Sequence, residues 1–246
     1  MPDSLTDDIR GVADEASSRF DLWANFINRV KVKNFAEIGV WRGEFAEHIL
    51  RCCPSIDHYY MVDPWRHLDN WNKPANVSDP EFDQIYSEAM ERTAFASHKR
   101  VVLRATTKQA LPTLENAELD AVYIDSDHTL KGITIDLISL YDQIKARGYI
   151  LGDDFVPSIW QHSDAFEPTL VFPLAIYFAE AKGDAIYGLP FKQFLISKSP
   201  EPDAFQFHDL TGIYQETSLR KQLLTGPKKR YKKTLRHLRA KIFFKQ

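Results

Sequence analysis

The sequence predicts an α/β protein with a mostly parallel β-sheet, and two observations point to this class. From residue 35 onward, short runs rich in β-branched and aromatic residues alternate with helical stretches, as in FAEIGV, then EFAEHILRCC, then HYYMVD. Residues 120–155 repeat this order as strand, helix and strand. Such alternation is typical of βαβ units, whose strands lie parallel in one sheet with helices on both faces.

The segments that flank the alternating region predict a helical N-terminus and an antiparallel edge. Between Ile9 and Val30, apolar residues recur at three- and four-residue steps, which predicts amphipathic helices that cap the sheet. Near the other end, the runs DAIYGL and KQFLIS are separated by a short turn at Leu189 and Pro190, which predicts a hairpin. The chain divides into an N-terminal helical cap (1–33), a main domain (34–198) with a candidate lid (65–86), a C-terminal extension (199–226) and a basic tail (227–246).

The composition is that of a soluble globular protein, with 246 residues of which 44% are hydrophobic and 26% are charged. There is no run of about 18 apolar residues that would predict a membrane span. The N-terminal sequence MPDSLTDDIR is acidic and polar, unlike a secretory signal. We therefore expect a cytoplasmic protein.

Basic residues are concentrated at the C-terminus, where residues 217–246 contain 11 Lys or Arg and no Asp or Glu. Residues 227–246 place apolar side chains at steps of three and four, as in a basic amphipathic helix. Such helices bind anionic membranes, so we expect peripheral binding at the inner membrane surface, with a solvated tail as the alternative. Nucleic acid is not an expected partner, because the rest of the chain is acidic and carries no recognition module. The sequence is compatible with an oligomer of this chain.

The first predicted strand and turn have the features of a site for a cationic cofactor. Glu37 ends the strand, and Gly39 and Gly43 follow in the turn before a helix. Glycines allow the backbone to pass close to a ligand, but the GxGxxG pattern of dinucleotide-binding folds is missing. The next strand ends in Asp63, in the position of a residue that accepts hydrogen bonds from ribose hydroxyls. This order of groups suits S-adenosylmethionine, whose sulfonium and ammonium groups are positive.

The motifs EIGVWRG, MVDPW, YIDSDHTLKGITIDL and YILGDDF resemble the class I S-adenosylmethionine-dependent methyltransferases. Within that class they are most similar to the macrocin/mycinamicin-type sugar O-methyltransferases. The resemblance implies a Rossmann-like, seven-stranded, mostly parallel sheet whose last strand is antiparallel. It also implies that Glu37 and Gly39 line the methionine end of the cofactor, that Asp63 lines the ribose, and that Ala105 and Thr106 lie near the adenine. The expected cofactor-binding residues are Glu37, Gly39, Gly43, Asp63, Ala105, Thr106 and Asp125.

Acidic residues at the ends of two predicted strands are candidates for metal binding and catalysis. Asp125, Asp153 and Asp154 carry hard oxygen ligands of the kind that suit Mg²⁺, and the resemblance implies that they bind this metal. His128 follows Asp125 by three residues, and the resemblance implies that it is the general base. Asp125 and His128 are therefore the expected catalytic residues, and Asp127 is expected to be the N-cap of the next helix.

These observations predict a Mg²⁺-assisted O-methyltransferase that acts on a sugar or glycan hydroxyl. Two alternatives stay open: a methyltransferase of another small-molecule hydroxyl, and a methyltransferase-fold binding protein without turnover. Trp71, Tyr86 and residues 160–162 are candidates for contact with the acceptor. The acceptor itself is not encoded in any recognisable motif.

Overall fold

Eight strands form one mixed sheet with the order β3-β2-β1-β4-β5-β7-β6-β8. The computed structural model describes residues 4–159, 163, 165–201 and 205–214. Strands β1 to β5 run parallel, and β7 pairs antiparallel with both β5 and β6. The α/β class and the antiparallel edge are confirmed. The strands are β1 (Asn34–Ile38), β2 (His58–Asp63), β3 (Arg100–Arg104), β4 (Leu119–Ile124), β5 (Ile144–Gly152), β6 (Ala185–Leu189), β7 (Gln193–Ser197) and β8 (Gln206–Asp209).

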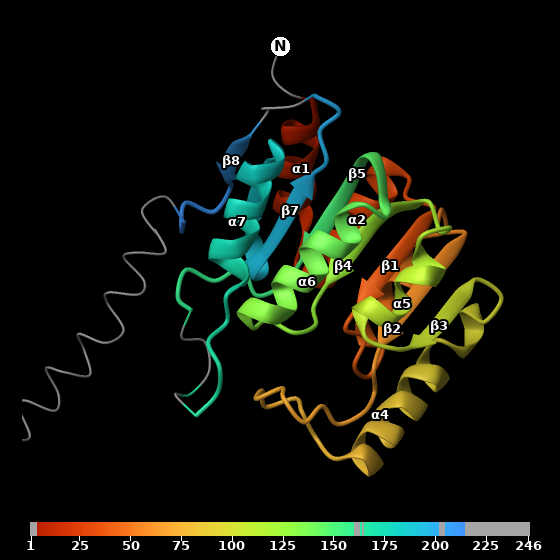
Figure 1. Ribbon diagram of the computed structural model, residues 1–246. Coiled ribbons are helices and arrows are strands. Elements are labelled where there is room, and N and C mark those ends of the chain that lie inside the picture. Colours follow the sequence, from red (N-terminus) through yellow and green to blue (C-terminus); the bar gives the residue numbers. More distant parts are fainter. Residues whose placement is uncertain (1–3, 160–162, 164, 202–204, 215–246) are drawn as a thin grey trace, which may run out of the picture.

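Helices cover both faces of this sheet (Figure 1). On one face, α2 packs between α1 and α3, and α3 also contacts α4; on the other face, α6 packs between α5 and α7. The helices are α1 (Ser4–Glu15), α2 (Arg19–Val30), α3 (Glu44–Cys52), α4 (Asp79–Arg92), α5 (Thr107–Leu114), α6 (Leu130–Tyr141) and α7 (Val171–Lys182). Two short 3-10 helices, Ala94–Ala96 and Pro190–Lys192, complete the described secondary structure.

Alternation along the central strands divides the core into two halves. In β4, Tyr123 packs with the cluster on the α2 and α3 face, whereas Val122 and Ile124 belong to the cluster under α5, α6 and α7. Successive side chains of a strand point to opposite faces, and both faces here are covered, so all three side chains are buried. The sheet therefore sits between two helical layers, and its carboxyl edge is left for a site.

The N-terminal helices are part of one of these layers. Helix α2 begins after Ser18, whose hydroxyl accepts a hydrogen bond from the backbone N–H of Asp21 at 3.1 Å. Trp23 and Phe26 are fully buried against the sheet, with Trp23 packed edge-on to Tyr123 at 6.2 Å. The predicted cap thus lies across a face of the sheet and not over one end.

The C-terminal extension adds a strand that the sequence did not predict. Strand β8 pairs in parallel with β6, with Gln206 opposite Ala185 and Asp209 opposite Gly188. The sheet therefore has eight strands where seven were expected. Tyr214 closes this edge by donating a hydrogen bond to the Phe155 carbonyl at 2.6 Å.

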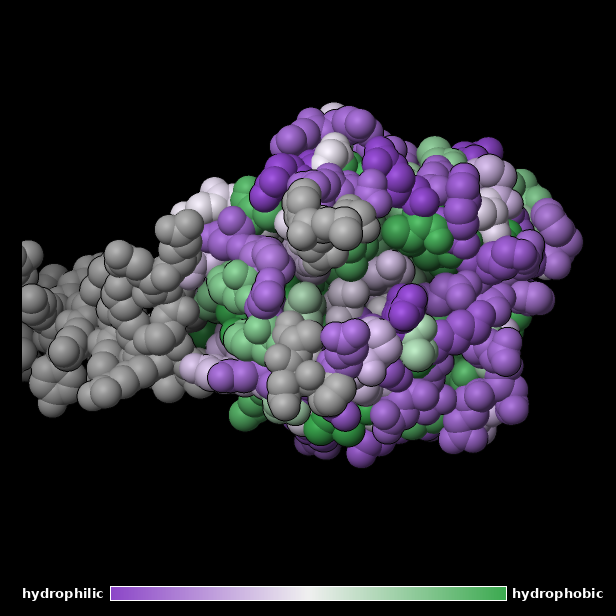
Figure 2. All heavy atoms as spheres, turned by 90° about the horizontal axis from the view of Figure 1, so that it is seen from above, coloured by the Kyte–Doolittle hydropathy of each residue, from purple (hydrophilic) through white to green (hydrophobic). Residues whose placement is uncertain are grey.

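Figure 2 views the molecule from above, at the end of the sheet away from the carboxyl ends of β1 and β4. The surface in this view is mostly hydrophilic, with hydrophobic residues in separate patches. Among the described residues, no helix is both long enough and apolar enough to cross a membrane. The basic tail at 227–246 lies outside the described residues.

Candidate active site

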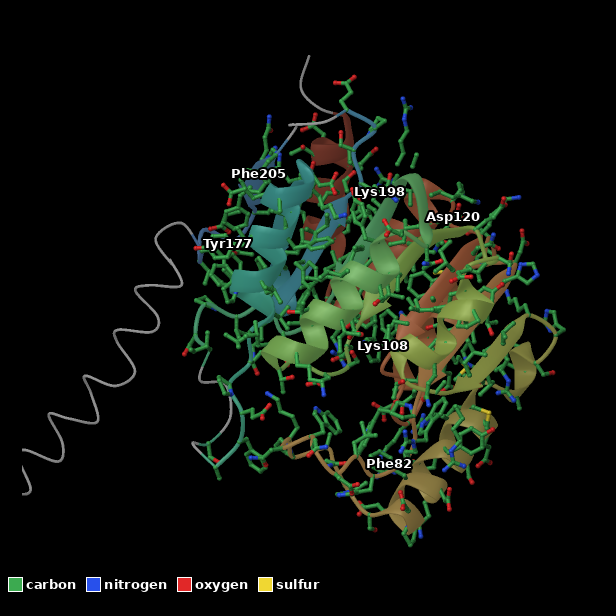
Figure 3. The ribbon with its side chains drawn as sticks, in the orientation of Figure 1. Phe82, Lys108, Asp120, Tyr177, Lys198 and Phe205 are labelled. Atoms are coloured by element: carbon green, nitrogen blue, oxygen red, sulfur yellow. The ribbon has the colours of Figure 1, made fainter. Side chains whose placement is uncertain are left out.

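The carboxyl ends of the parallel strands border a cavity of about 660 Å³. This is a typical size for a small-molecule site, and an α/β sheet places ligands at this edge. Phe82 of α4 and Lys108 of α5 both line the cavity. Figure 3 shows Phe82 below the sheet and Lys108 at the level of its lower part, both away from Asp120 and Lys198 at the upper end. The expected site residues that line the cavity are Glu37, Gly39, Asp63, Ala105, Thr106, Asp125, His128 and Asp154.

Gly39 allows the ends of β1 and β4 to approach each other. Its φ is +90°, and a Cβ there would lie 2.0 Å from the carbonyl oxygen of Asp125. The same approach lets the Asp125 N–H donate to the Ile38 carbonyl at 2.8 Å. Gly43 has a different function: it precedes α3 with φ +75° and packs against Ala89, outside the residues that line the cavity.

Asp63 fixes the turn after β1. Its Oδ2 accepts hydrogen bonds from the backbone N–H groups of Val40 at 2.9 Å and Trp41 at 3.0 Å, and its Oδ1 accepts one from Trp65 at 2.8 Å. Burial raises the pKa of Asp63, and these three hydrogen bonds act in the opposite direction. The carboxylate therefore shapes the wall where a ribose was expected.

Glu37 is a buried acid next to other acids. Its Oε2 accepts a hydrogen bond from the Tyr59 hydroxyl at 2.8 Å. Burial raises the pKa of Glu37 well above its ordinary value, and the negative charges of Asp125 and Asp63 raise it further. A cation bound beside Glu37 would stabilise its charged form. The carboxyl groups at this end of the cavity therefore fit a ligand with an ammonium or sulfonium group.

Asp136 on α6 connects two segments that border the other end of the cavity. Its carboxylate accepts hydrogen bonds from the Ser126 hydroxyl and, at 2.6 Å, from the Thr107 hydroxyl. Burial raises the pKa of Asp136 to about 6, although both hydrogen bonds lower it. Ala105 and Thr106, expected near an adenine, line the cavity next to Thr107. Asp136 thus ties the loop after β4 to the start of α5.

The three carboxylates expected to bind Mg²⁺ do not converge on one point. Nη1 of Arg19 lies 3.0 Å from Asp125 Oδ2 and also contacts Asp153 Oδ2, so a guanidinium stands between these acids. Asp154 instead contacts His128. Within the described ranges no set of three or more His, Cys, Asp or Glu side chains could hold a metal. The expectation of a Mg²⁺ site is therefore corrected: this arrangement does not fit a divalent ion, because an arginine takes its position.

His128 and Asp154 form a pair at the cavity wall. Nδ1 of His128 lies 2.7 Å from Asp154 Oδ2, so Nδ1–H donates to the carboxylate and Nε2 carries the lone pair. Nε2 is buried, lies 3.7 Å from Asp125 Oδ1 and makes no hydrogen bond within the described structure. Burial opposes the charge of His128, but the hydrogen bond to Asp154 and the charge of Asp125 raise its pKa overall.

Helix α6 begins differently from the prediction. Its N-cap is Thr129, whose hydroxyl accepts a hydrogen bond from the Gly132 N–H at 3.1 Å. Asp127, the predicted N-cap, accepts hydrogen bonds from the Thr129 N–H and from the Trp71 indole, each at 3.0 Å. Asp127 therefore connects the loop after β4 to the segment above the cavity.

That segment, residues 65–78, forms a roof, while residues 79–86 of the expected lid belong to α4. Lys73 Nζ donates to the Glu167 carbonyl at 2.8 Å, and Asn72 Nδ2 donates to the Ala165 carbonyl at 2.9 Å. Trp71 lines the cavity, whereas Tyr86 packs against Trp65 with ring centroids 5.1 Å apart and is not among the residues that line the cavity. Residues 160–162 lie outside the described residues.

Three residues at the site were not found from the sequence: Arg19, Asp136 and Gln193. Gln193 donates to Asp153 Oδ1 and accepts from the Trp23 indole at 2.7 Å, which connects the hairpin to the strand ends. Arg19 lies 106 residues from Asp125 along the chain, so no local pattern reports their contact. Asp136 is a polar residue on a buried helical face, a signal that the sequence did contain.

Comparison with known proteins places part of the chain beside a known kind of domain. Residues 36–155 match the family model described as a methyltransferase domain. No curated protein sequence matches the chain significantly.

Solved structures share the fold at low sequence identity. An O-methyltransferase from Bacillus cereus in complex with SAH is 15% identical, with a TM-score of 0.53 over 80% of this chain and 90% of that one. TomG from Streptomyces achromogenes, an O-methyltransferase of tomaymycin synthesis in complex with SAM, is 15% identical, with a TM-score of 0.52 over 81% and 91%. SAH-bound methyltransferase PaMTH1 from Podospora anserina is 18% identical, with a TM-score of 0.50 over 81% and 89%.

Residues 36–155 are similar to a methyltransferase domain, and the solved structures of methyltransferases share the fold of the sheet and its helices. This domain contains β1 to β5 and most of the residues that border the cavity. This similarity agrees with the class of protein that the sequence motifs indicated.

Proposed function

We propose that the protein transfers a methyl group from S-adenosylmethionine to a hydroxyl oxygen of a sugar or glycan. The observation that carries this proposal is the His128–Asp154 pair, with a buried, unpartnered Nε2 beside the cavity. Oxygen methylation needs a base because an alcohol is a poor acid, and histidine is suited to this task near neutral pH.

The cofactor would bind along β1 and β2, with its cationic end near Glu37 and its adenosine toward Ala105 and Thr106. When bound, it supplies an electrophilic methyl group on a positively charged sulfur. Glu37 would bind the ammonium group as a carboxylate, and Gly39 would keep the backbone close to the ligand. Asp63 holds the turn in shape through its three backbone hydrogen bonds.

His128 would act on the acceptor hydroxyl. Nε2 takes the hydroxyl proton as the oxygen–carbon bond forms and the carbon–sulfur bond breaks, leaving a methyl ether and S-adenosylhomocysteine. The imidazolium is stabilised by Asp154 at 2.7 Å and by Asp125 at 3.7 Å. The proton then passes to solvent. No metal is needed to balance this step.

A sugar acceptor is supported by the chemistry of the roof. Trp71 presents an indole to the cavity, and its edge is held by Asp127. Lys131 and Asp154 add polar groups to the cavity wall. An aromatic face among hydrogen-bonding groups suits a pyranose ring. A phenol or another small-molecule hydroxyl remains the alternative acceptor, and a binding protein without turnover is disfavoured because the His128–Asp154 pair is intact.

The test is a methyl-transfer assay with labelled S-adenosylmethionine and a panel of nucleotide sugars, lipid-linked glycans and catechols. We expect label in a sugar or glycan, with turnover lowered about 100-fold or more in His128→Ala, the size of effect a general base contributes. Label only in catechols would overturn the sugar assignment. No label in any hydroxyl compound, with S-adenosylhomocysteine still bound, would favour the binding protein.

A further inference from the structure

We infer that Arg19 is the cation of this active site, serving in place of a divalent metal, and that methyl transfer by this chain is metal-independent. The inference rests on the proposed function, because it assigns Arg19 a part in the transfer to an acceptor oxygen. Arg19 borders the cavity and contacts both Asp125 and Asp153 through Nη1.

Arg19 is delivered by a fixed element. It is the first residue of α2, directly after the N-cap Ser18, and the helix buries five side chains against the protein core. The neighbouring Phe20 packs edge-on to Phe45 at 5.5 Å. The backbone of Arg19 is therefore held in place. The Arg19 side chain is 36% exposed. A loose surface arginine would not have such support.

The carboxylates are already satisfied around this arginine. Asp153 Oδ1 accepts hydrogen bonds from Gln193 Nε2 and, at 2.7 Å, from the Asp154 N–H, while its Oδ2 faces Arg19. Gln193 is itself fully buried, and its Oε1 accepts from the Trp23 indole and the Tyr123 hydroxyl. A metal at this point would have to displace the guanidinium and leave it without its anionic partners. The pair is partly buried, so removing the arginine would leave two carboxylates with reduced solvation and no counter-charge.

The electrostatics agree with a permanent cation. Burial opposes the charge of Arg19, but Tyr123 and the Asp125 carboxylate raise the pKa of the guanidinium overall. An arginine stays charged at every pH at which the protein is folded, and its planar group has five N–H donors. The contacts with Asp125, Asp153 and Tyr123 all use Nη1, so the rest of the fork can donate to an acceptor oxygen.

A guanidinium lowers the pKa of a neighbouring hydroxyl less than a divalent ion would, since it has half the charge and is not a Lewis acid. The acceptor proton must therefore be taken by His128 as the methyl group arrives. Arg19 would orient the acceptor and neutralise Asp125 and Asp153, while His128 acts as the base. Acceptors that rely on chelation to a metal, such as catechols, gain no advantage at this site.

The experiment compares the wild type, Arg19→Met and Arg19→Lys in two measurements. The first is turnover in excess EDTA and with added Mg²⁺. The second is binding of Mn²⁺ followed by electron paramagnetic resonance in the presence of S-adenosylhomocysteine. Arg29→Met is the matched control, because Arg29 lies on the same helix but pairs with Asp8 at the surface. Binding of S-adenosylhomocysteine verifies that each variant is folded.

We expect the wild type and Arg29→Met to keep full turnover in EDTA and to leave Mn²⁺ free. Arg19→Met should lose about 100-fold in turnover, comparable to removal of one electrostatic group from an active site, with Arg19→Lys between the two. Arg19→Met should also bind Mn²⁺ through the exposed carboxylates, and a second change, Asp153→Asn, should abolish that binding.

The inference is overturned if EDTA stops the wild type and Mg²⁺ restores it, or if the wild type binds Mn²⁺ in a manner that Asp153→Asn removes. Full turnover of a folded Arg19→Met would also overturn it. If Arg19→Met does not fold, the wild-type measurements and Arg19→Lys decide. Because Mn²⁺ binding needs no acceptor, this readout holds even if the proposed function fails.

Discussion

The two nitrogens of His128 have different surroundings, and this difference decides what the residue can do. Nδ1 is bound to Asp154, and Nε2 is buried beside the cavity without a hydrogen bond in the described structure. Asp154 is held for this contact at φ +56°, a conformation that aspartate tolerates better than most residues. In the proposed reaction Asp154 would position His128 as the base, whereas the family resemblance had implied that Asp154 is a metal ligand.

The His128–Asp154 pair predicts a pH dependence of turnover. Because Asp154 and Asp125 raise the pKa of His128, the base is neutral only above this raised value, so kcat/KM should rise with pH through it. Asp154→Asn removes the charge and should shift the rise to lower pH while lowering kcat about 10-fold or more. The measurement is a pH profile of kcat/KM. An unchanged profile in Asp154→Asn would show that the pair does not act in the reaction.

Replacing Glu37 should have opposite effects on the stability of the protein and on its affinity for S-adenosylhomocysteine. Its pKa is raised in the folded protein, so its contribution to the free energy of unfolding is present at low pH and is lost as pH rises through the raised pKa. Glu37→Gln should therefore be more stable than the wild type once the pH exceeds the raised pKa of Glu37. The same change should weaken S-adenosylhomocysteine about 10- to 100-fold, the range for a charge-assisted hydrogen bond. Denaturant unfolding at several pH values and calorimetry measure the two effects, and a variant with wild-type affinity would contradict the assignment.

Among the helices and strands, α6 connects two other segments of the site through the side chain of Asp136. Asp136 connects α6 to Ser126 after β4 and to Thr107 at the start of α5. Its pKa of about 6 lies above the ordinary 3.8, so charging it costs the folded state ~3 kcal/mol. This free energy of unfolding should be lost as pH rises from 4 through 6.

Asp136→Asn tests this directly, since an amide can replace the acid without titrating. The difference in unfolding free energy between the variant and the wild type should grow in favour of the variant between pH 4 and pH 7. Denaturant titrations at pH 4, 5, 6 and 7 give the difference. A constant difference over that range would show that Asp136 does not titrate there.

Elements with a strong local pattern could be predicted, and those set by pairing with distant segments could not. The strand–helix–strand of residues 120–155 and the hairpin at Leu189 and Pro190 appear in the structure as β4, α6, β5, β6 and β7. Strand β8 has four residues in a proline-containing segment, and its partner β6 fixes it. A short edge strand has too little alternation of its own to be recognised.

At the scale of the molecule, the carboxyl edge was predicted because strand ends in a parallel sheet must meet there. Glu37, Asp63, Asp125 and His128 line one cavity, as their positions after the strands implied. The contacts of their side chains were not predictable. Arg19 reaches Asp153 across 134 residues of sequence, and helix α2 was expected only to cover the sheet. The contacts of Arg19 with Asp125 and Asp153 therefore had to come from the structure.

Membrane binding by the basic tail stays a prediction from the sequence. We propose that residues 227–246 attach the protein to anionic membrane surfaces, since each nearby Lys or Arg contributes about 1 kcal/mol at such a surface. Deleting residues 227–246 should abolish sedimentation with phosphatidylserine vesicles at low salt while methyl transfer to a soluble acceptor continues. Equal sedimentation of the full-length and truncated proteins would leave the tail without this function.

The central claim is that the carboxyl ends of β1, β2 and β4 form a site for an adenosyl methyl donor. Calorimetric titration with S-adenosylhomocysteine and, in parallel, with NAD tests it most directly. One S-adenosylhomocysteine should bind per chain, binding should be weaker in Glu37→Gln, and NAD should give no heat of binding. Binding of NAD without binding of S-adenosylhomocysteine would contradict it.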